Sequence, residues 1–260
     1  MLKDKIVFIT GASAGIGEAC SEAFAREGCR LILAARRLAK LDALAARLEA
    51  DHGADCHTIE LDVRDREKVD AVIENLPDQW GEIDILVNNA GLSRGLDKVH
   101  QALHTDWEEM IDTNVKGLLW VSRAVMPGMV ERDSGHVINI GSIAGRQVYP
   151  GGNVYCATKY AVRAITQGMR IDLLGTKVKC SSVDPGMVET EFSAVRYHGD
   201  TEIAAKTYQN FPPLKAEDIA ETVLFCATRP PHVNIHDVLI MPQDQAAVYA
   251  SHPRGIGKDL

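Results

Sequence analysis

The sequence lacks the cysteine patterns that mark disulfide frameworks and structural metal sites. Its six cysteines include no C-x-x-C pair and no framework spacing. In a chain of 260 residues such scattered cysteines favour free thiols in a reducing compartment. Two histidine pairs, His100 with His104 and His232 with His236, have helical metal spacing but no obvious further ligands. We therefore expect no metal site.

Long hydrophobic runs are absent as well. No stretch approaches the ~18 uninterrupted apolar residues that a membrane helix needs. The first apolar run, at residues 6–9, meets Gly11 too soon to form the core of a signal peptide. These absences predict a cytoplasmic protein with no membrane partner.

Positive charge is scarce and scattered. The chain has 28 Lys and Arg against 36 Asp and Glu, for a net charge of -8, and contains no basic run that could follow phosphates. We therefore expect no nucleic-acid partner. The remaining composition, 46% hydrophobic and 25% charged, is typical of a soluble globular protein with an ordinary core.

What the sequence does have is a repeated alternation of short apolar runs and amphipathic segments. The apolar runs are continuous, as in strands that are buried on both faces of a parallel sheet. Such an alternation predicts an α/β fold, a doubly wound parallel sheet in three α/β/α layers, and one domain over residues 1–260. The predicted strands are 6–10, 31–35, 57–61, 83–88, 136–141, 178–183 and 238–241. The predicted helices are 16–26, 38–48, 66–76, 107–130, 154–174 and 216–227.

Two segments do not fit the alternation. Residues 190–213 are polar and follow a strand at the edge where open α/β sheets bind ligands, so we expect a substrate lid there. Residues 243–260 form a tail that is predicted to be irregular, and that could either fray or dock on a neighbouring subunit.

A glycine-rich turn joins the first predicted strand to the first predicted helix. Glycines there let the backbone turn tightly and approach a pyrophosphate, and the helix N-terminus offers free N–H groups. A tight turn without a ligand is the alternative, but the position favours a dinucleotide site. The candidate residues are Gly11, Ser13, Ala14, Gly15, Ile16 and Gly17.

Two arginines at the end of the second predicted strand indicate which dinucleotide binds. NAD sites usually place an acid there for the ribose 2′-hydroxyl, whereas an arginine accommodates the 2′-phosphate of NADP. The sequence has Arg36 and Arg37 and no acid. A solvated pair is the alternative, but helix N-termini disfavour cations, so we expect an anion to compensate for them. The predicted cofactor is NADP(H).

Short polar segments follow the next two predicted strands. Asp62, with Val63 after it, can accept a hydrogen bond from the adenine amine, although it could equally cap the next helix. Asn89, Ala90 and Gly91 permit close approach to a ribose, although they could also form an ordinary turn.

Tyr155 and Lys159 carry the predicted chemistry. They stand four residues apart in a helical pattern, so both project from one face. An ammonium group beside a tyrosine favours phenolate and should lower its pKa from ~10 toward neutrality. We therefore expect Tyr155 to act as general acid or base, with Ser142 bonded to the substrate oxygen. A surface pair is the alternative for the Y-x-x-x-K spacing alone, and the accompanying motifs argue against it.

The order of these motifs resembles the short-chain dehydrogenase/reductase family over nearly the whole chain. The resemblance implies a Rossmann-like sheet with NADP(H) across its carboxyl edge and contacts from Tyr155 and Lys159 to the cofactor. It further implies that Asn114 sustains a water-linked proton relay through Lys159. The residues implied to flank the nicotinamide amide are Pro185, Gly186, Met187, Val188 and Thr190.

Segments 110–117, 151–155, 190–197 and 206–210 also resemble a subgroup of that family, the bacterial 3-hydroxy acid dehydrogenases. This subgroup includes NADP-dependent serine and allo-threonine dehydrogenases, and its close relatives reduce sulfoacetaldehyde. The resemblance implies a small hydroxy acid or related anionic substrate and a homotetramer. The alternatives are a reductase of neutral carbonyls and a non-catalytic NADP-binding regulator, against which the presence of Tyr155 and Lys159 argues.

A small anionic substrate needs a cation near Tyr155, because burying an unpaired carboxylate is costly. Arg196, in the predicted lid, is the preferred candidate, since guanidinium binds carboxylates in a bidentate fashion. Arg146, in the loop after Ser142, is the second candidate. Arg196 could instead pair with an acid of its own segment, namely Glu189, Glu191 or Asp200.

Overall fold

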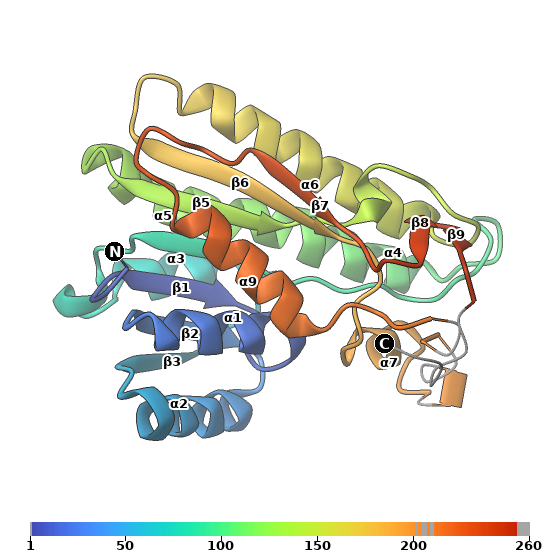
Figure 1. Ribbon diagram of the computed structural model, residues 1–260, viewed down its shortest axis with the longest axis horizontal. Helices are drawn as coiled ribbons and strands as arrows, with labels where there is room; N and C mark the ends of the chain where they lie inside the picture. The colour runs from blue at the N-terminus through green and yellow to red at the C-terminus, as the bar shows by residue number, and fades with distance from the viewer. Residues whose placement is uncertain (1, 201, 204–206, 209–210, 254–260) are drawn as a thin grey trace.

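Parallel strands form one seven-stranded sheet in the computed structural model, which describes residues 2–200, 202–203, 207–208 and 211–253 (Figure 1). The strand order is β3-β2-β1-β4-β5-β6-β7, and all six neighbouring pairs are parallel. The strands are β1 Ile6–Thr10, β2 Arg30–Ala35, β3 Cys56–Glu60, β4 Ile85–Asn88, β5 Gly135–Ile140, β6 Val178–Pro185 and β7 Asp237–Ile240.

Helices cover both faces of the sheet. α1 (Gly15–Arg26), α2 (Leu38–His52) and α9 (Ala216–Ala227) share one hydrophobic cluster with the strands. α3 (Arg66–Glu74), α5 (Leu118–Glu131) and α6 (Asn153–Asp172) share the other cluster. The central strands β1 and β4 are buried throughout, as their continuous apolar runs predict. The predicted three-layer α/β class is therefore confirmed.

The sheet reverses its winding at β1, whose neighbours are β2 on one side and β4 on the other. Open α/β sheets bind ligands at such a point, beyond the carboxyl ends of the strands. The glycine turn after β1, the arginines after β2 and the polar segment after β4 all reach this edge. Residues that lie far apart in the sequence are thus collected along one border of the sheet.

The helix predicted at 107–130 is more complex than its apolar pattern suggests. It consists of α4 (His104–Ile111), a π-helical segment (Asp112–Gly117) and α5, which follow one another without a break. A π segment inside a helix is uncommon and often marks a functional site. Apolar periodicity over a long window does not resolve a local change from i→i+4 to i→i+5 bonding, so the sequence did not predict it.

The two irregular segments contain more structure than predicted. A short helix, α7 (Phe192–Arg196), lies within the predicted lid, of which residues 201, 204–206, 209 and 210 are outside the described part. The tail forms an antiparallel hairpin of β8 (Gln245–Ala247) and β9 (Ala250–Ser251), so the prediction of an irregular tail is wrong for these residues. Strands of two or three residues are too short to give a periodic signal. Residues 254–260 lie outside the described part.

The hairpin docks on the same chain, at the end of the sheet that carries α7 (Figure 1). The buried Gln245 side chain accepts a 2.8 Å hydrogen bond from the backbone N–H of Met187, just after β6. The side chain of Gln147 accepts a 2.9 Å bond from the backbone N–H of Val248. In the part of the chain that the structure describes, no helix is both long and apolar enough to span a bilayer.

Candidate active site

A cavity of about 340 Å³ follows the carboxyl edge of the sheet. It is lined by the ends of β1 to β6, by the start of α6 and by α7. Residues that the sequence predicts for the cofactor line it from end to end, with the exceptions of Gly17 and Met187. They are Gly11, Ser13, Ala14, Gly15, Ile16, Arg36, Arg37, Asp62, Val63, Asn89, Ala90, Gly91, Tyr155, Lys159, Pro185, Gly186, Val188 and Thr190.

The glycine turn forms a close-packed wall of this cavity. A Cβ atom at Gly17 would lie 2.3 Å from the carbonyl oxygen of Gly11, so only glycine fits there. Asn89 packs on the same turn, and its side-chain amide donates to the carbonyls of Thr10 (3.0 Å) and Gly11 (3.1 Å). No side chain caps the N-terminus of α1, which leaves its first N–H groups for an anion such as a pyrophosphate.

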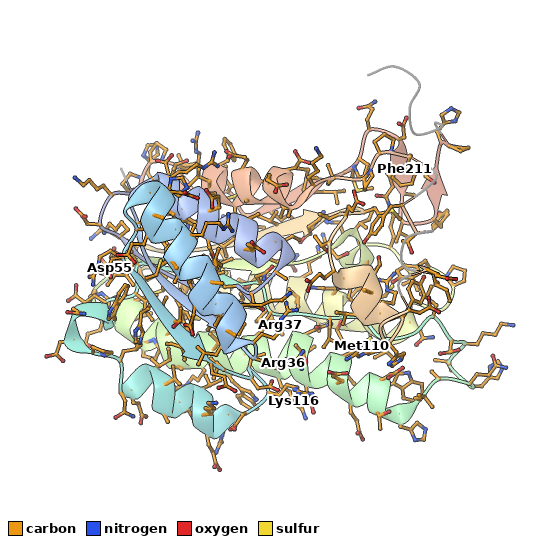
Figure 2. All side chains as sticks on the ribbon, turned by 90° about the horizontal axis from the view of Figure 1, so that it is seen from below. Arg36, Arg37, Asp55, Met110, Lys116 and Phe211 are labelled. Carbon is orange, nitrogen blue, oxygen red and sulfur yellow. The ribbon has the colours of Figure 1, made fainter. Side chains whose placement is uncertain are left out.

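Arg36 and Arg37 lie beside each other where β2 gives way to α2 (Figure 2). Arg37 donates from Nη1 to Glu191 over 2.8 Å and from Nε and Nη2 to the hydroxyl of Ser13 over 3.2 and 3.1 Å. Arg36 is 3.8 Å from Glu109. The sequence predicts that an anion compensates for the two arginines. The carboxylates of Glu109 and Glu191 supply part of this negative charge, although both lie far from residues 36 and 37 in the sequence.

Asp62 is held by its neighbour Arg64. The guanidinium donates from Nη2 to Oδ2 over 2.6 Å and from Nε to both carboxylate oxygens over 3.0 Å. Burial raises the pKa of Asp62, but the hydrogen bonds and charge of Arg64 outweigh it and hold the pKa below its usual value. Asp62 does not cap α3; the side chain of Asp65 does, by accepting from the Lys68 N–H. The capping alternative for Asp62 is therefore excluded.

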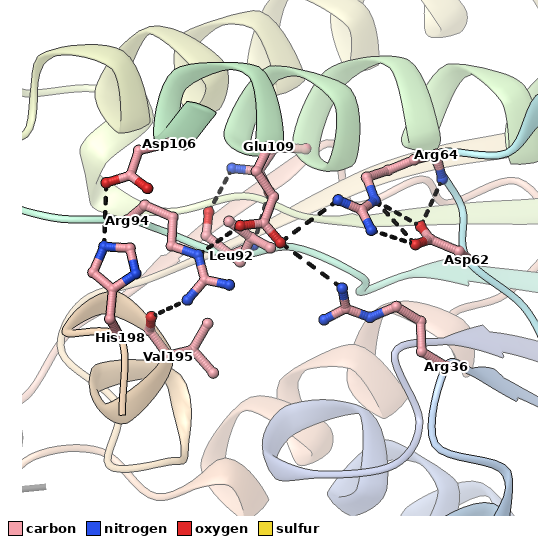
Figure 3. Close-up of polar contacts among 10 residues, drawn as sticks. Arg36, Asp62, Arg64, Leu92, Arg94, Asp106, Glu109, Val195 and His198 are labelled. Carbon is pink, nitrogen blue, oxygen red and sulfur yellow. Dashed lines mark hydrogen bonds and ion pairs between the residues drawn. The ribbon is translucent and has the colours of Figure 1, made fainter. Parts of the chain in front are cut away.

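Glu109 on α4 gathers three arginines around one carboxylate (Figure 3). Its oxygens lie 2.7 Å from Arg94, 3.6 Å from Arg64 and 3.8 Å from Arg36. The hydrogen bond from Arg94 and the charges of the three arginines lower the pKa of Glu109 against the effect of its burial. Arg94 also donates to the carbonyl of Val195 in α7 over 2.6 Å. Glu109 and Arg94 were not predicted from the sequence, because each is an ordinary charged residue in its local pattern.

Tyr155 and Lys159 project from α6 into the inner end of the cavity, and both are buried. The Lys159 ammonium donates to the carbonyl of Ile140 over 2.9 Å and lies 6.0 Å from the Tyr155 ring centroid. Ser142 follows β5, accepts a 3.0 Å bond from the Ala144 N–H and lines the same cavity as Tyr155, whose pKa it lowers. The predicted trio therefore meets at one point of the cavity wall.

The pKa of Tyr155 differs from the sequence expectation. Burial raises it above its usual value, against the charge of Arg196 and the hydrogen bond of Ser142. Burial also lowers the pKa of Lys159 to about 8, against the attraction of Asp184. The expected depression of the tyrosine pKa by Lys159 is thus wrong. Helical spacing reveals a neighbouring charge, but it does not reveal how little water surrounds the pair.

Asn114 lies in the π-helical segment and fixes the loop after β4. Its Oδ1 accepts from the Leu92 N–H over 2.8 Å, and its Nδ2 donates to the Leu92 carbonyl over 2.8 Å. The same Nδ2 donates to Thr158 on α6 over 3.0 Å. A Cβ at Gly91 would lie 3.3 Å from Asn114 Oδ1 and 3.6 Å from Lys159 Nζ, so both side chains approach Gly91.

Arg196 ends α7 and stands over the aromatic side chains of the inner site. Its guanidinium carbon is 5.5 Å from the ring centroid of Tyr155 and 5.2 Å from that of Phe192. One Nη donates to the hydroxyl of Tyr149 over 3.2 Å, while the buried Nε has no hydrogen-bond partner among the described residues. Arg196 therefore has hydrogen-bonding capacity left beside Tyr155.

The acids that could have neutralised Arg196 are engaged elsewhere or are not in contact with it. Glu191 pairs with Arg37 and Lys40, and Asp200 accepts from backbone N–H groups of residues 202 and 203. Within the described residues, no carboxylate lies within ion-pair distance of Arg196. The other candidate, Arg146, is held by Asp184 (2.7 Å) and Asp237 (2.9 Å).

Comparison with known proteins is consistent with this geometry. Residues 5–200 match the family described as short chain dehydrogenase. The chain is 50% identical to the NADP-dependent 3-hydroxy acid dehydrogenase YdfG of Salmonella typhi, over 93% of this chain and 96% of the relative. A closed form of serine dehydrogenase complexed with NADP+ superposes with a TM-score of 0.89 at 46% identity, over 96% of this chain and 99% of that one. Serine dehydrogenase from Escherichia coli superposes with a TM-score of 0.80 at 42% identity, over 93% and 99%.

Proposed function

The chain belongs to the short-chain dehydrogenase/reductase family, and from this premise we propose that it transfers a hydride between NADP(H) and a small hydroxy acid or related anionic alcohol/carbonyl pair. The observation that carries the substrate class is the partly unpaired guanidinium of Arg196 next to the Tyr155 ring. The names of the 3-hydroxy acid and serine dehydrogenases that it is similar to point to the same chemistry.

The cavity suits a dinucleotide. The glycine turn and the uncapped start of α1 would hold the pyrophosphate, and Asp62, Val63 and the segment after β4 would surround the adenosine half. Arg36 and Arg37 would bind the 2′-phosphate, and residues 185–190 would flank the nicotinamide. When bound, NADPH supplies the hydride that reduces the substrate carbonyl.

Tyr155 would move the proton that accompanies this hydride. In the reductive direction its Oη donates a proton to the substrate oxygen, and in the oxidative direction it accepts that proton. A raised phenol pKa keeps Tyr155 protonated, which suits it to act as the acid. Ser142, which lines the cavity together with Tyr155, would hold the substrate oxygen beside Oη.

Lys159 and Asn114 would assist this transfer by passing protons to and from Tyr155. Lys159 has a pKa lowered to about 8, so it can exchange a proton near neutral pH, and it would also hold the nicotinamide ribose. Asn114 would sustain a water-linked relay to Lys159 past Gly91, which both side chains approach. The direct hydrogen bonds of Asn114 go to Leu92 and Thr158, so this relay needs ordered water.

A substrate panel combined with Arg196→Ala tests the substrate class. We expect turnover of NADPH with malonic semialdehyde or sulfoacetaldehyde, or of NADP+ with serine, 3-hydroxyisobutyrate or 3-hydroxypropionate. Arg196→Ala should raise the KM of an anionic substrate about 10- to 100-fold, since a charge-assisted hydrogen bond contributes about 1.5–3 kcal/mol. A neutral aldehyde of similar size is the control, and its KM should change little.

Two outcomes would contradict the proposal. A uniform change for charged and neutral substrates would remove the carboxylate role from Arg196. Activity on bulky neutral ketones alone would instead favour a general carbonyl reductase.

We further propose that residues 1–260 act as a single catalytic domain in which segment 190–213 is the substrate lid. α7 supports this role, because it brings Arg196 over Tyr155 and is clamped by Arg94 at Val195. A cytoplasmic homotetramer is the assembly we propose, supported by apolar side chains that α5 and α6 expose to solvent.

A further inference from the structure

Glu191 occupies an anion position next to the proposed 2′-phosphate site. One carboxylate oxygen accepts from Arg37 Nη1 over 2.8 Å, and the other accepts from Lys40 Nζ over 2.9 Å. Arg37 is the N-cap residue of α2, and Lys40 lies in the first turn of this 15-residue helix. A carboxylate that bridges two cations at a helix N-terminus has the chemistry of a phosphate oxygen in the same place.

Glu191 belongs to the wall of the cavity. Glu191 and Arg37 both line the cavity, and Arg37 Nε and Nη2 already donate to Ser13 of the glycine turn. Every nitrogen of the Arg37 guanidinium therefore has a partner, and a phosphate that approaches Nη1 from the side of Lys40 competes with Glu191 for the same N–H. The pairs are half exposed, with side-chain exposures of 47% for Arg37 and 50% for Glu191 and Lys40, so exchanging one anion for another costs little.

We propose that Glu191 is an internal competitor of the 2′-phosphate for Arg37 and Lys40, and that Lys40 is a further 2′-phosphate ligand. The inference rests on the proposed use of NADP(H). A bound 2′-phosphate takes over both cations and displaces the carboxylate, whereas NAD(H) leaves the Glu191 pairs intact. Glu191 thereby sets how strongly the site prefers the phosphorylated cofactor.

The position of Glu191 links the exchange of the carboxylate for the 2′-phosphate to the helix that carries Arg196. Glu191 precedes α7, and its carbonyl accepts a 3.0 Å bond from the Val195 N–H. Arg196, the last residue of the same short helix, stands over Tyr155. Displacement of the carboxylate therefore removes the side-chain contacts with Arg37 and Lys40 from one end of the helix, and the other end carries the proposed substrate cation.

Glu191→Gln tests the competition by direct binding without substrate. Titration of the purified protein with NADPH and with NADH, followed by cofactor fluorescence, should show an NADPH Kd about two- to tenfold lower in the variant. The NADH Kd should stay unchanged, and the gain should shrink as salt screens the charges. Glu221→Gln is the matched control, because Glu221 lies on α9 and forms an exposed pair with Arg26 of α1 over 2.6 Å, so this substitution removes the same charge outside the cavity.

Substitutions of the two cations complete the test. Lys40→Gln should raise the Kd of NADPH but not that of NADH, and the gain from Glu191→Gln should be smaller in an Arg37→Gln background. An unchanged or weaker NADPH affinity in Glu191→Gln would overturn the inference, because it would mean that Glu191 supports the arginine instead. Failure of the wild-type protein to bind NADPH would overturn the proposed function itself, so the two failures are distinguishable.

Discussion

Tyr155 is buried away from water, and this burial controls its pKa more than the charges around it do. Its side chain projects from α6 and is buried against Phe192, with 5.7 Å between the centroids of the two rings. In such a place the loss of water outweighs nearby positive charge, and the pKa of the phenol rises. The group is thus held as an acid until a substrate or cofactor changes the field around it.

Tyr155→Phe should keep cofactor binding and lose most turnover. Phenylalanine retains the ring that packs on Phe192 but removes the proton that Tyr155 would transfer. General acid–base catalysis typically contributes ~10²–10⁴-fold, so kcat should fall by at least that range while the Kd of NADPH stays within a few-fold. Single-turnover kinetics and cofactor titration measure the two quantities.

Tyr160→Phe on the same helix is the matched control for this substitution, since Tyr160 is exposed and outside the cavity lining. It should retain activity. A Tyr155→Phe variant with near-normal kcat would remove Tyr155 from the mechanism.

At the scale of residues, the sequence predicted the motifs of the site but not the contacts between distant charged side chains. Motifs that act through backbone shape or fixed spacing, such as Gly11–Gly17 and Tyr155 with Lys159, all reach the cavity or its wall. Contacts between distant charged residues were not predictable. Glu191 meets Arg37 across 154 positions, and no local pattern specifies such a pair. The sequence also did not reveal the burial that shifts the pKa values of Tyr155 and Lys159.

At the scale of elements, most helices and strands were predictable, because apolar runs and amphipathic segments alternate along the chain. The helix at 216–227 was predicted with its observed bounds, and the strands differ from prediction by at most two residues at either end. The departures are elements whose signal is local bonding or short length: the π segment 112–117, α7 and the β8–β9 hairpin. Two of these three, the π segment and α7, contribute residues to the cavity wall.

The outer faces of α5 and α6 predict self-association. α5 buries Leu118 and Val121 yet leaves Leu119 and Val130 exposed, and Ile171 at the end of α6 is 72% exposed. Helices with apolar side chains on opposite faces are usually buried on both. Light scattering at micromolar concentration should therefore give a multiple of the 28.4 kDa chain mass, fourfold for the proposed tetramer. A monomer under these conditions would mean that these side chains face water.

At the scale of the whole molecule, the sheet itself carries a pH-sensitive group outside the site. His136 lies in β5 and is 4% exposed, with its Nε2 2.8 Å from the hydroxyl of Ser181 on β6. Burial, helped by the charge of Lys179, lowers the pKa of His136 to about 3 from 6.5. The folded protein therefore keeps this imidazole neutral at a pH where the unfolded chain takes up a proton.

This difference predicts an acid-sensitive core. Below the unfolded pKa of ~6.5 the unfolded chain binds a proton that the folded chain does not, so the free energy of unfolding falls by ~1.4 kcal/mol per pH unit. The contribution is complete above that pKa and is lost as the pH falls toward about 3. By pH 5 the loss amounts to about 2 kcal/mol. His136→Gln removes the titrating group, so the variant should lose about that much less stability between pH 7 and pH 5.

Urea unfolding at a fixed protein concentration measures the difference at both pH values, and it does so even if the variant is less stable overall, since only the change with pH is compared. His104→Gln, at an exposed position on α4, is the control and should follow the wild type. Equal acid sensitivity of the wild type and His136→Gln would show that His136 is protonated in the folded sheet. The loss of stability below pH 6.5 would then have to come from other groups.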